Sequence, residues 1–344
     1  MSAAFSYPLG FALLITALTA SGQSQDEWPV SAASEQGLSL EALSRLDKQI
    51  RTQLPHLRSL LIARRGRLVF ENYYGDASRD GLHNMQSMTK SVSSALVGIA
   101  LKKGFITSLD NRVADYFPEY RVVIQDERMK AITIRQILTM SSGIDEARLS
   151  FDKAFANPVE EILRWRLLYD PGHGFSYSSA AAHLLGGVLR AVSGQSVLDF
   201  ARAELFRPLG MGEVAWYADK TGLQSGGMSG LWRSRDLLKL GELYLRGGRW
   251  RGHSIIPAEY VADSVKVHNE GDFFGTHVQY GYMWWIKKIG GHDAFWAAGY
   301  GGQYLMVVPD IDMVVLCTSD WKQPEYPEHF ALVGTFILAS VVER

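Results

Sequence analysis

Residues 85–104 read MQSMTKSVSSALVGIALKKG. From Ser87 to Leu101, small or apolar side chains occupy nearly every face that a helix would present. Such a stretch is typical of a helix that is buried on all sides. Gly104 ends it, because glycine readily adopts the left-handed conformation that closes a helix. The sequence therefore predicts a helix inside the protein, with Ser87 at its N-terminal end.

Ser87 and Lys90 lie three residues apart at the start of this helix. That spacing puts both on one face with a rise of about 4.5 Å, so the lysine amine reaches the serine hydroxyl and can remove its proton. The burial lowers the pKa of a lysine toward the range that such a base needs. At a helix N-terminus the dipole also favours developing negative charge. The alternative interpretation is a buried polar pair at a helix start.

The Ser-x-x-Lys spacing is weak evidence by itself, since it recurs at 150–153 and 319–322, and only at Ser87 does it open a long buried helix. Two distant segments add to it. Tyr177 follows a turn and precedes an apolar helical run, and a tyrosine near a lysine can shuttle protons. In residues 295–303 (FWAAGYGGQ), the glycines let the backbone approach a ligand, so that an N–H there would complete an oxyanion hole. The alternatives are that Tyr177 is a core residue and that the glycines of 295–303 form a hairpin bend.

The segments around the central helix predict an α+β fold. Upstream, Ser39 starts an amphipathic helix, and β-rich runs at 59–63 and 67–74 form a hairpin. Downstream, helical and breaker signals alternate through a helix near 234–246. The last third is strand-like at 280–287, 295–298, 304–308 and 313–317, and the apolar run 330–342 suits a buried terminal helix. This order fits a sheet domain interrupted by a helical insertion.

Four segments together resemble the superfamily of serine β-lactamases and penicillin-binding proteins. The resemblance is strongest to its class C β-lactamase-related branch of esterases and aminohexanoate-dimer hydrolases, and it covers the chain from Leu38 to the C-terminus. The segments are MQSMTKSVSSALVGIALKKG (85–104), ITIRQILTMSSGID (132–145), PGHGFSYSS (171–179) and RDLLKLGELYLRGGRWRG (235–252). Four matches in the family's order make the resemblance specific.

The resemblance implies a β-lactamase/transpeptidase-like fold. It predicts an antiparallel sheet domain, built from 38–85 and 225–344 and flanked by terminal helices. An all-helical domain, 86–224, is inserted and carries the nucleophile helix at the interface. By the same resemblance, Ser87 is the acylated nucleophile, Lys90 its base and Tyr177 the proton shuttle, and the backbone N–H groups of Ser87 and Tyr300 form the oxyanion hole. The residues expected to contact substrate are Ser179, Trp296, Gly299 and Gln303, and Trp284, Trp285 and Tyr300 are further aromatic candidates.

Two departures from the family pattern bear on the substrate. Tyr177-Ser178-Ser179 stands where the family has Tyr-x-Asn, so Ser179 replaces an amide that helps to hold the lysine and the acyl side of the substrate. Ala297-Ala298-Gly299 stands where the family has Lys-Thr-Gly or His-x-Gly, so the cation that favours a substrate carboxylate is absent. Esters and amides without a carboxylate are therefore favoured over β-lactams and peptidoglycan stem peptides.

Composition excludes other functions. The 344 residues carry 35 Lys and Arg against 36 Asp and Glu, and this balance argues against nucleic-acid binding, which is driven by a basic surface. Cys317 is the single cysteine, so an intrachain disulfide is excluded. It lies in an apolar run, which indicates a buried, inert thiol. No metal-ligand cluster and no nucleotide-binding motif occurs in the sequence, so we expect neither a metal nor a cofactor.

The N-terminus predicts export. Residues 8–20 (PLGFALLITALTA) are apolar but short for a membrane span, and Ala20-Ser21-Gly22 has the form of a signal-peptidase site. We therefore expect residues 1–22 to be a signal peptide, the mature protein to be periplasmic or secreted, and no stable membrane span to remain. The absence of Lys and Arg before Arg45 keeps open a retained anchor or a different start codon.

These observations predict an exported serine hydrolase that cleaves a small ester or amide through an acyl-enzyme on Ser87, activated by Lys90 and Tyr177. A D,D-peptidase or weak class C-like β-lactamase is the rival within enzymology. A non-catalytic cell-wall-binding relative is the rival of another class. The acyl and leaving groups and the oligomeric state are left open by the sequence.

Overall fold

The computed structural model describes residues 28–148, 155–273, 275–323 and 337–342. The predicted signal peptide, the Ser-x-x-Lys repeat at 150–153 and most of the expected terminal helix lie outside the described residues. Among the residues that are described, no helix is long and apolar enough to cross a membrane.

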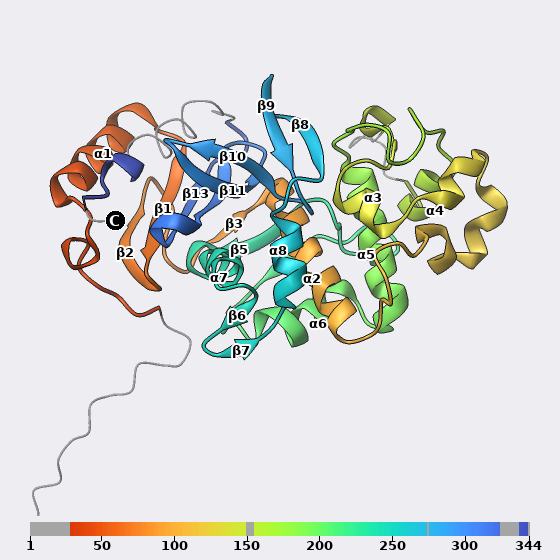
Figure 1. Cartoon of the computed structure of the whole chain (residues 1–344), viewed down its shortest axis with the longest axis horizontal. Coiled ribbons are helices and arrows are strands. Elements are labelled where there is room, and N and C mark those ends of the chain that lie inside the picture. The colour runs from red at the N-terminus through yellow and green to blue at the C-terminus, as the bar shows by residue number, and fades with distance from the viewer. Residues whose placement is uncertain (1–27, 149–154, 274, 324–336, 343–344) are drawn as a thin grey trace, which may run out of the picture.

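One antiparallel sheet of eight strands organises the fold (Figure 1). Its strand order is β2-β1-β13-β12-β11-β10-β9-β8, so β1 from the N-terminal part pairs directly with β13 from the C-terminal part. The strands are β1 (Leu57–Arg64), β2 (Arg67–Tyr73), β8 (Asn269–Phe273), β9 (Thr276–Tyr280), β10 (Trp285–Ile289), β11 (His292–Gly299), β12 (Gln303–Val308) and β13 (Met313–Ser319). Smaller sheets are formed by β3 (Leu82–Asn84), β5 (Gly230–Arg233) and β4 (Ala215–Trp216), and by β6 (Arg249–Trp250) and β7 (His253–Ser254).

Helices fill the stretch between β3 and β4 and also flank the sheet. Figure 1 shows α3, α4 and α5 gathered at the end of the molecule opposite β1 and β2. The helices are α1 (Leu40–Gln53), α2 (Thr89–Lys102), α3 (Ile134–Leu138), α4 (Pro158–Leu163), α5 (Ser179–Ser193), α6 (Val197–Ala201), α7 (Ser234–Leu245) and α8 (Ala258–Ser264). This arrangement confirms the predicted α+β, β-lactamase/transpeptidase-like fold. The exact domain boundaries stay a prediction.

Local signals explain where several elements begin and turn. The Ser39 hydroxyl accepts a hydrogen bond from Ala42 N at 3.2 Å, which caps α1 as expected. Arg65 and Gly66 both have positive φ, 50° and 72°, and join β1 to β2 in the predicted hairpin. Positive φ at both central positions is the geometry that matches the twist of paired strands. Cys317 is fully buried, and its burial raises the pKa of the thiol to about 12.

The predicted central helix is α2. All residues from Thr89 to Ala100 are buried, and α2 lies between the sheet and the group of α3 to α5 (Figure 1). A methyl group on Gly98 would lie 2.5 Å from the ring of Tyr260, so α2 and α8 pack closely at this point. The helix is therefore held on all sides, and its N-terminal end has a fixed position relative to the sheet.

One strand prediction is wrong. The run 280–287 was expected to be a single strand, but Tyr280 ends β9, residues 281–284 turn, and Trp285 begins β10. The turn is closed by a hydrogen bond from Gly281 N to Trp284 O, with Met283 at a φ of 63°. The aromatic residues in and around this turn concealed it, because Tyr and Trp are also typical of strands. The β8–β9 hairpin, rich in polar residues, was not predicted.

Candidate active site

Ser87 lies in a tight turn that leads into α2. The turn is a 3-10 helix, Gln86–Met88, and its first residue, Gln86, has a φ of 49°. A non-glycine residue rarely adopts this conformation, and it persists only where the surroundings hold it. Here Asn84 Oδ1 accepts a hydrogen bond from Gln86 N at 3.0 Å, and the Thr89 hydroxyl donates to Gln86 O at 2.6 Å. These contacts hold the half-buried Ser87 side chain at the end of the helix.

Lys90 is fully buried beneath Ser87 and donates three hydrogen bonds. Its Nζ lies 3.1 Å from Ser87 Oγ, 2.9 Å from Ser179 Oγ and 2.9 Å from the carbonyl oxygen of Gly227. An amine that loses a proton keeps two N–H groups and gains a lone pair. The Gly227 carbonyl can only accept, and Ser179 can accept as well. The arrangement thus directs the lone pair of a neutral Lys90 at the Ser87 hydroxyl.

The surroundings bring Lys90 close to neutrality. Burial, which disfavours the charged form, lowers the pKa of Lys90 to about 8, and the nearby negative charge of Glu146 opposes that shift. A group with this pKa is about one tenth neutral at pH 7. A base in this range can take a proton from a serine during reaction and still be regenerated at neutral pH.

Glu146 connects the lysine site to the start of α5. Its Oε2 accepts hydrogen bonds from the backbone N of Ser179 at 2.5 Å and of Ala180 at 3.2 Å, the first two residues of α5. A carboxylate is favoured at a helix N-terminus, where N–H groups lack partners within the helix. Glu146 thereby fixes the backbone of Ser179, whose side chain holds Lys90.

Tyr177 faces both Ser87 and Lys90. The Lys90 Nζ lies 4.6 Å from the centre of the Tyr177 ring, which also stacks on Trp285 at a centroid distance of 5.5 Å. Burial holds the pKa of Tyr177 well above its ordinary value, although a hydrogen bond with the Ser87 side chain acts in the opposite direction. The phenol therefore keeps its proton at neutral pH, and Tyr177 suits a donor of protons better than a base.

The end of β11 closes the site from the sheet side. A methyl group on Gly299 would lie 2.2 Å from the backbone oxygen of Met85, so this strand end and the Ser87 turn touch backbone to backbone. Only a residue without a side chain permits such an approach. Tyr300, the next residue, is 51% exposed and opens the turn to β12.

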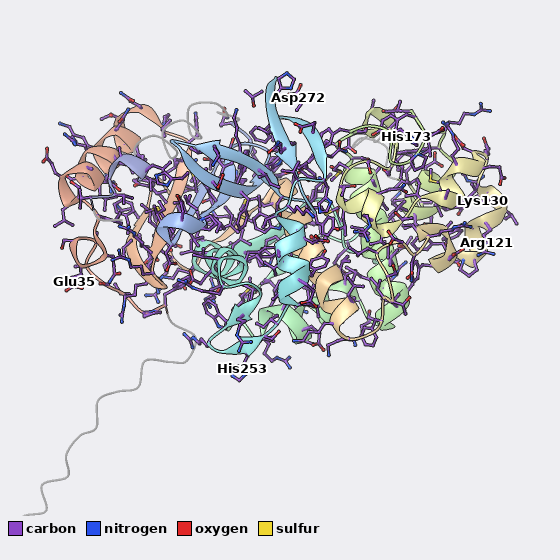
Figure 2. All side chains as sticks on the ribbon, viewed as in Figure 1. Glu35, Arg121, Lys130, His173, His253 and Asp272 are labelled. Carbon is purple, nitrogen blue, oxygen red and sulfur yellow. The ribbon has the colours of Figure 1, made fainter. Side chains whose placement is uncertain are left out.

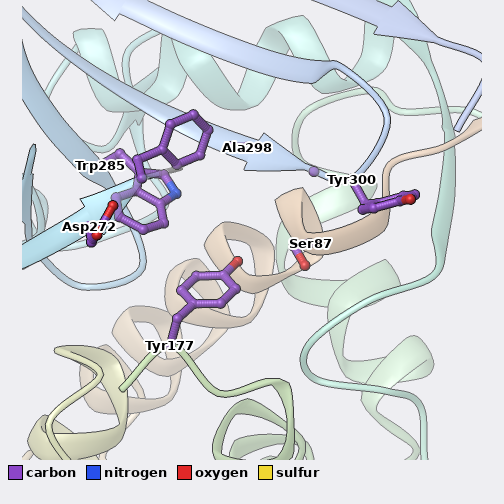
Figure 3. A pocket seen from close by; sticks show the side chains of 8 residues that line it. Ser87, Tyr177, Asp272, Trp285, Ala298 and Tyr300 are labelled. Carbon is purple, nitrogen blue, oxygen red and sulfur yellow. The ribbon is translucent and has the colours of Figure 1, made fainter. Parts of the chain in front are cut away.

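These elements surround a pocket of about 240 Å³ (Figure 3). Its wall is mainly aromatic and apolar, and Ser87 lies on it between Tyr177 and Tyr300 in the view of Figure 3. The lining residues are Ser87, Tyr177, Asp272, Phe273, Trp285, Ala298, Gly299 and Tyr300. Among the described residues, no group of three or more His, Cys, Asp or Glu side chains could hold a metal ion.

The structure brings together most of the predicted site residues, but it gives three of them other surroundings. Trp296 is fully buried and packs edge-on against Phe273 at 6.0 Å, so it belongs to the core and does not line the pocket. Gln303 is fully buried, and its amide exchanges hydrogen bonds of 2.9 and 3.0 Å with the backbone of Ser319. Ser179 holds Lys90 and is not among the pocket-lining residues.

Alternation along β11 distinguishes its two neighbouring alanines. Successive residues of a strand point to opposite faces, so Ala298 lines the pocket whereas Ala297 is 1% exposed within the sheet. Of the aromatic candidates, Trp285 and Tyr300 line the pocket, and Trp284 is fully buried.

Sequence reasoning missed Glu146, Gly227, Asp272 and Phe273. Glu146 directly follows the segment 132–145 that supported the resemblance, which was the one available signal. The Gly227 carbonyl has no sequence signature, since any residue supplies one. Asp272 and Phe273 belong to the unpredicted β8–β9 hairpin.

Comparison with known proteins places the chain in a family. The family model described as Beta-lactamase matches residues 58–333. A 6-aminohexanoate-dimer hydrolase of Paenarthrobacter ureafaciens is 25% identical over 329 residues, which cover 83% of this chain and 80% of that protein. Esterase EstB of Burkholderia gladioli is 27% identical over 176 residues, which cover 44% of each chain.

Solved structures share the fold. EstCE1, a hydrolase with promiscuous acyltransferase activity, matches with a TM-score of 0.73 at 17% identity, covering 88% of this chain and 99% of that one. A family VIII carboxylesterase matches with a TM-score of 0.72 at 16% identity, covering 91% and 99%. Because the family model spans most of its length, the chain belongs to the Beta-lactamase family of serine hydrolases, within the superfamily of serine β-lactamases and penicillin-binding proteins.

Proposed function

We propose that this protein cleaves a small ester or amide through an acyl-enzyme formed on Ser87. The observation that carries the proposal is the fully buried Lys90 amine, 3.1 Å from the Ser87 hydroxyl, with a pKa lowered to about 8. A serine is a weak nucleophile unless an adjacent base removes its proton. Lys90 is the only residue within hydrogen-bond distance of Ser87 that combines burial with a pKa in that range, among those the structure describes.

In the acylation step, Lys90 takes the proton of Ser87 as Ser87 Oγ forms a bond to the carbonyl carbon of the substrate. The backbone N–H groups of Ser87 and Tyr300 stabilise the negative oxygen that develops, an effect worth roughly a hundredfold to a thousandfold in rate for each donor. When the bond to the leaving group breaks, the phenol of Tyr177 gives its proton to that group. Lys90 then gives up the proton that it took from Ser87, and this proton restores the phenol of Tyr177.

Deacylation reverses these roles with water as the nucleophile. Lys90 takes a proton from the water, whose oxygen bonds to the acyl carbon. The bond between that carbon and Ser87 Oγ then breaks as Lys90 passes the proton on to Ser87 Oγ. The carboxylic acid leaves, and the site returns to its starting state. The side chains that exchange protons, Ser87, Lys90 and Tyr177, already contact one another, so no large movement of these groups is required.

The choice of ester or amide over β-lactam follows from the pocket. Its lining residues include no lysine, arginine or histidine, so a substrate carboxylate finds no cation on the described pocket wall. The names of the 6-aminohexanoate-dimer hydrolase and of the esterases support this substrate class for the present chain. We also propose that the protein is exported, on the basis of the apolar segment 8–20 and the small residues that follow it.

Intact-mass analysis tests the mechanism. The protein is incubated separately with a fluorophosphonate, with p-nitrophenyl butyrate and with a penicillin, and the Ser87→Ala variant is treated in parallel. We expect a stable phosphonate adduct and rapid turnover of the butyrate, both lost in the variant. Rapid turnover of the penicillin would favour a β-lactamase, a stable penicilloyl adduct would favour a D,D-peptidase, and the absence of any adduct or turnover would favour a non-catalytic relative.

A further inference from the structure

The pocket contains one formal charge on its described wall, and that charge is negative. Of the eight lining residues, only Asp272 has a carboxylate side chain, and none has a lysine, arginine or histidine side chain. Lys90 is not part of the wall, because its amine is buried behind Ser87 and its N–H groups are directed at Ser87, Ser179 and Gly227. A substrate group that enters the pocket therefore meets an anion and not a cation.

Asp272 lines the pocket from the β8–β9 hairpin. It is the fourth residue of β8, close to the tip of the β8–β9 hairpin, where Figure 2 shows it at the edge of the molecule. Its Oδ1 accepts a hydrogen bond from Gly275 N at 2.6 Å, which fixes the orientation of the carboxylate. None of the residues that the structure describes forms an ion pair with Asp272, so its charge is available to a ligand.

Aromatic rings line the same pocket as this carboxylate. Phe273 follows it directly and packs edge-on against Trp285 at 4.9 Å, and Trp285 stacks on Tyr177 at 5.5 Å. Figure 3 shows Asp272 and Trp285 on one side of the pocket and Tyr300 on the other. Aromatic faces attract organic cations, and quaternary ammonium groups are bound by such rings in many proteins. A pocket lined by one carboxylate and several rings therefore suits a cation that is partly apolar.

From this arrangement we infer that the substrate carries an ammonium group, which binds between Asp272 and the aromatic wall while its ester or amide carbonyl lies at Ser87. The inference rests on the proposed function and defines its substrate class. It reverses the charge preference of a site that recognises a carboxylate, because Asp272 repels an anion in the same pocket. The ammonium is not a reacting group, so Asp272 determines specificity and takes no part in proton transfer.

The exposure of Asp272 limits the expected preference for a cationic substrate. Asp272 is exposed, so its attraction for a cation is partly screened by water, and the ring contacts are worth a similar modest amount. Together they predict a preference of roughly threefold to thirtyfold for a cationic substrate over an uncharged one of the same shape. Salt should reduce the part due to Asp272, because exposed charges are screened.

A matched pair of esters tests the inference on the full chain. We would measure kcat/KM for butyrylcholine and for its uncharged carbon isostere, in which a quaternary carbon replaces the nitrogen. The wild type should prefer butyrylcholine by the factor above. In Asp272→Asn the ratio of the two values should fall by about twofold to fivefold, and added NaCl should no longer lower it. Glu270→Gln removes a carboxylate from the same strand outside the pocket, and it should leave the ratio unchanged.

Calorimetric titration of the Ser87→Ala variant with the same two esters separates binding from catalysis. Tighter binding of butyrylcholine that Asp272→Asn reduces supports the inference, even if neither ester is hydrolysed and the proposed function fails. Equal binding of the two esters overturns it, even if both are hydrolysed through Ser87. An equal loss of the preference in Glu270→Gln also overturns it, since the effect would then come from the general charge of the hairpin.

Discussion

Substitution of Gly299 by alanine should separate the two halves of the proposed oxyanion hole. The added methyl carbon would lie 2.2 Å from the backbone oxygen of Met85 and 3.0 Å from Gln303 Cβ. Real Cβ contacts are essentially never closer than 3.0 Å, so β11 and the Ser87 turn must move apart by about 0.8 Å. Neither partner can rotate away, because the nearest one is backbone.

The expected cost is about a hundredfold in kcat for p-nitrophenyl butyrate. A misplacement of about 1 Å at a reacting centre costs roughly that factor, and the loss of one oxyanion donor costs roughly a hundredfold to a thousandfold. Stability should fall by about 1 to 3 kcal/mol, as for other overpacked positions. The measurements are kcat and KM, the rate of labelling by a fluorophosphonate, and chemical unfolding.

Gly241→Ala is the matched control. There the methyl group would meet Val314 Cγ1 at 2.4 Å and Leu305 Cδ1 at 2.9 Å, where α7 packs on the sheet. This variant should lose a similar amount of stability, about 1 to 3 kcal/mol, and keep its kcat. If Gly299→Ala is folded and its kcat stays within about threefold of the wild type, the role given to the end of β11 is wrong.

Four further outcomes are expected. Ser87→Ala should abolish fluorophosphonate labelling and turnover. Ser319→Ala, at the other described Ser-x-x-Lys position, should be labelled normally, and intact-mass analysis of both variants tests this difference. Activity should rise with pH to a plateau above the Lys90 pKa of about 8, because only the neutral amine accepts a proton. Lys90→Arg should be inactive at every pH, since a guanidinium does not lose its proton. A near-normal rate in that variant would reduce Lys90 to a structural role. Glu146→Gln should move the rising limb of the pH profile to lower pH, since Glu146 raises the pKa of Lys90, and an unmoved limb would refute that coupling. N-terminal sequencing from the native host should find a mature start near residues 21–25, and an intact Met1 in soluble protein would refute export.

The sequence was most informative where one residue type has one physical meaning. The all-round apolar pattern of α2, the capping serine at position 39 and the Arg65-Gly66 turn each predicted an element that the structure contains. Ser87, Lys90 and Tyr177 were grouped by local spacing and family resemblance, and the fold brings them into contact. These features depend on neighbours in sequence or on a motif, and both can be read from one chain.

The remaining features depend on contacts between distant segments. Trp285 and Trp296 are paired opposite each other on neighbouring strands, yet only Trp285 lines the pocket, and Trp296 packs in the core against Phe273 from β8. Gln303 was expected to contact substrate, but its side-chain amide forms hydrogen bonds with the backbone of Ser319, which lies on a different strand. Asp272 is a polar residue in a polar hairpin, and nothing local distinguishes it from Glu270 two residues earlier.

The buried position of Lys90 has a consequence for folding. The unfolded chain binds a proton at Lys90 with the ordinary pKa of 10.5, but the folded protein does so only below about 8. Between these values the unfolded state holds more protons, so this residue lets stability rise with pH across that window, and below it the folded protein bears a penalty of about 3 kcal/mol. A methionine at this position would remove the penalty together with the base. It would also leave the Gly227 carbonyl and the Ser179 hydroxyl without the amine that donates to them. The proton that folding disfavours on Lys90 is thus the same proton that must be absent for the amine to act as the proposed base.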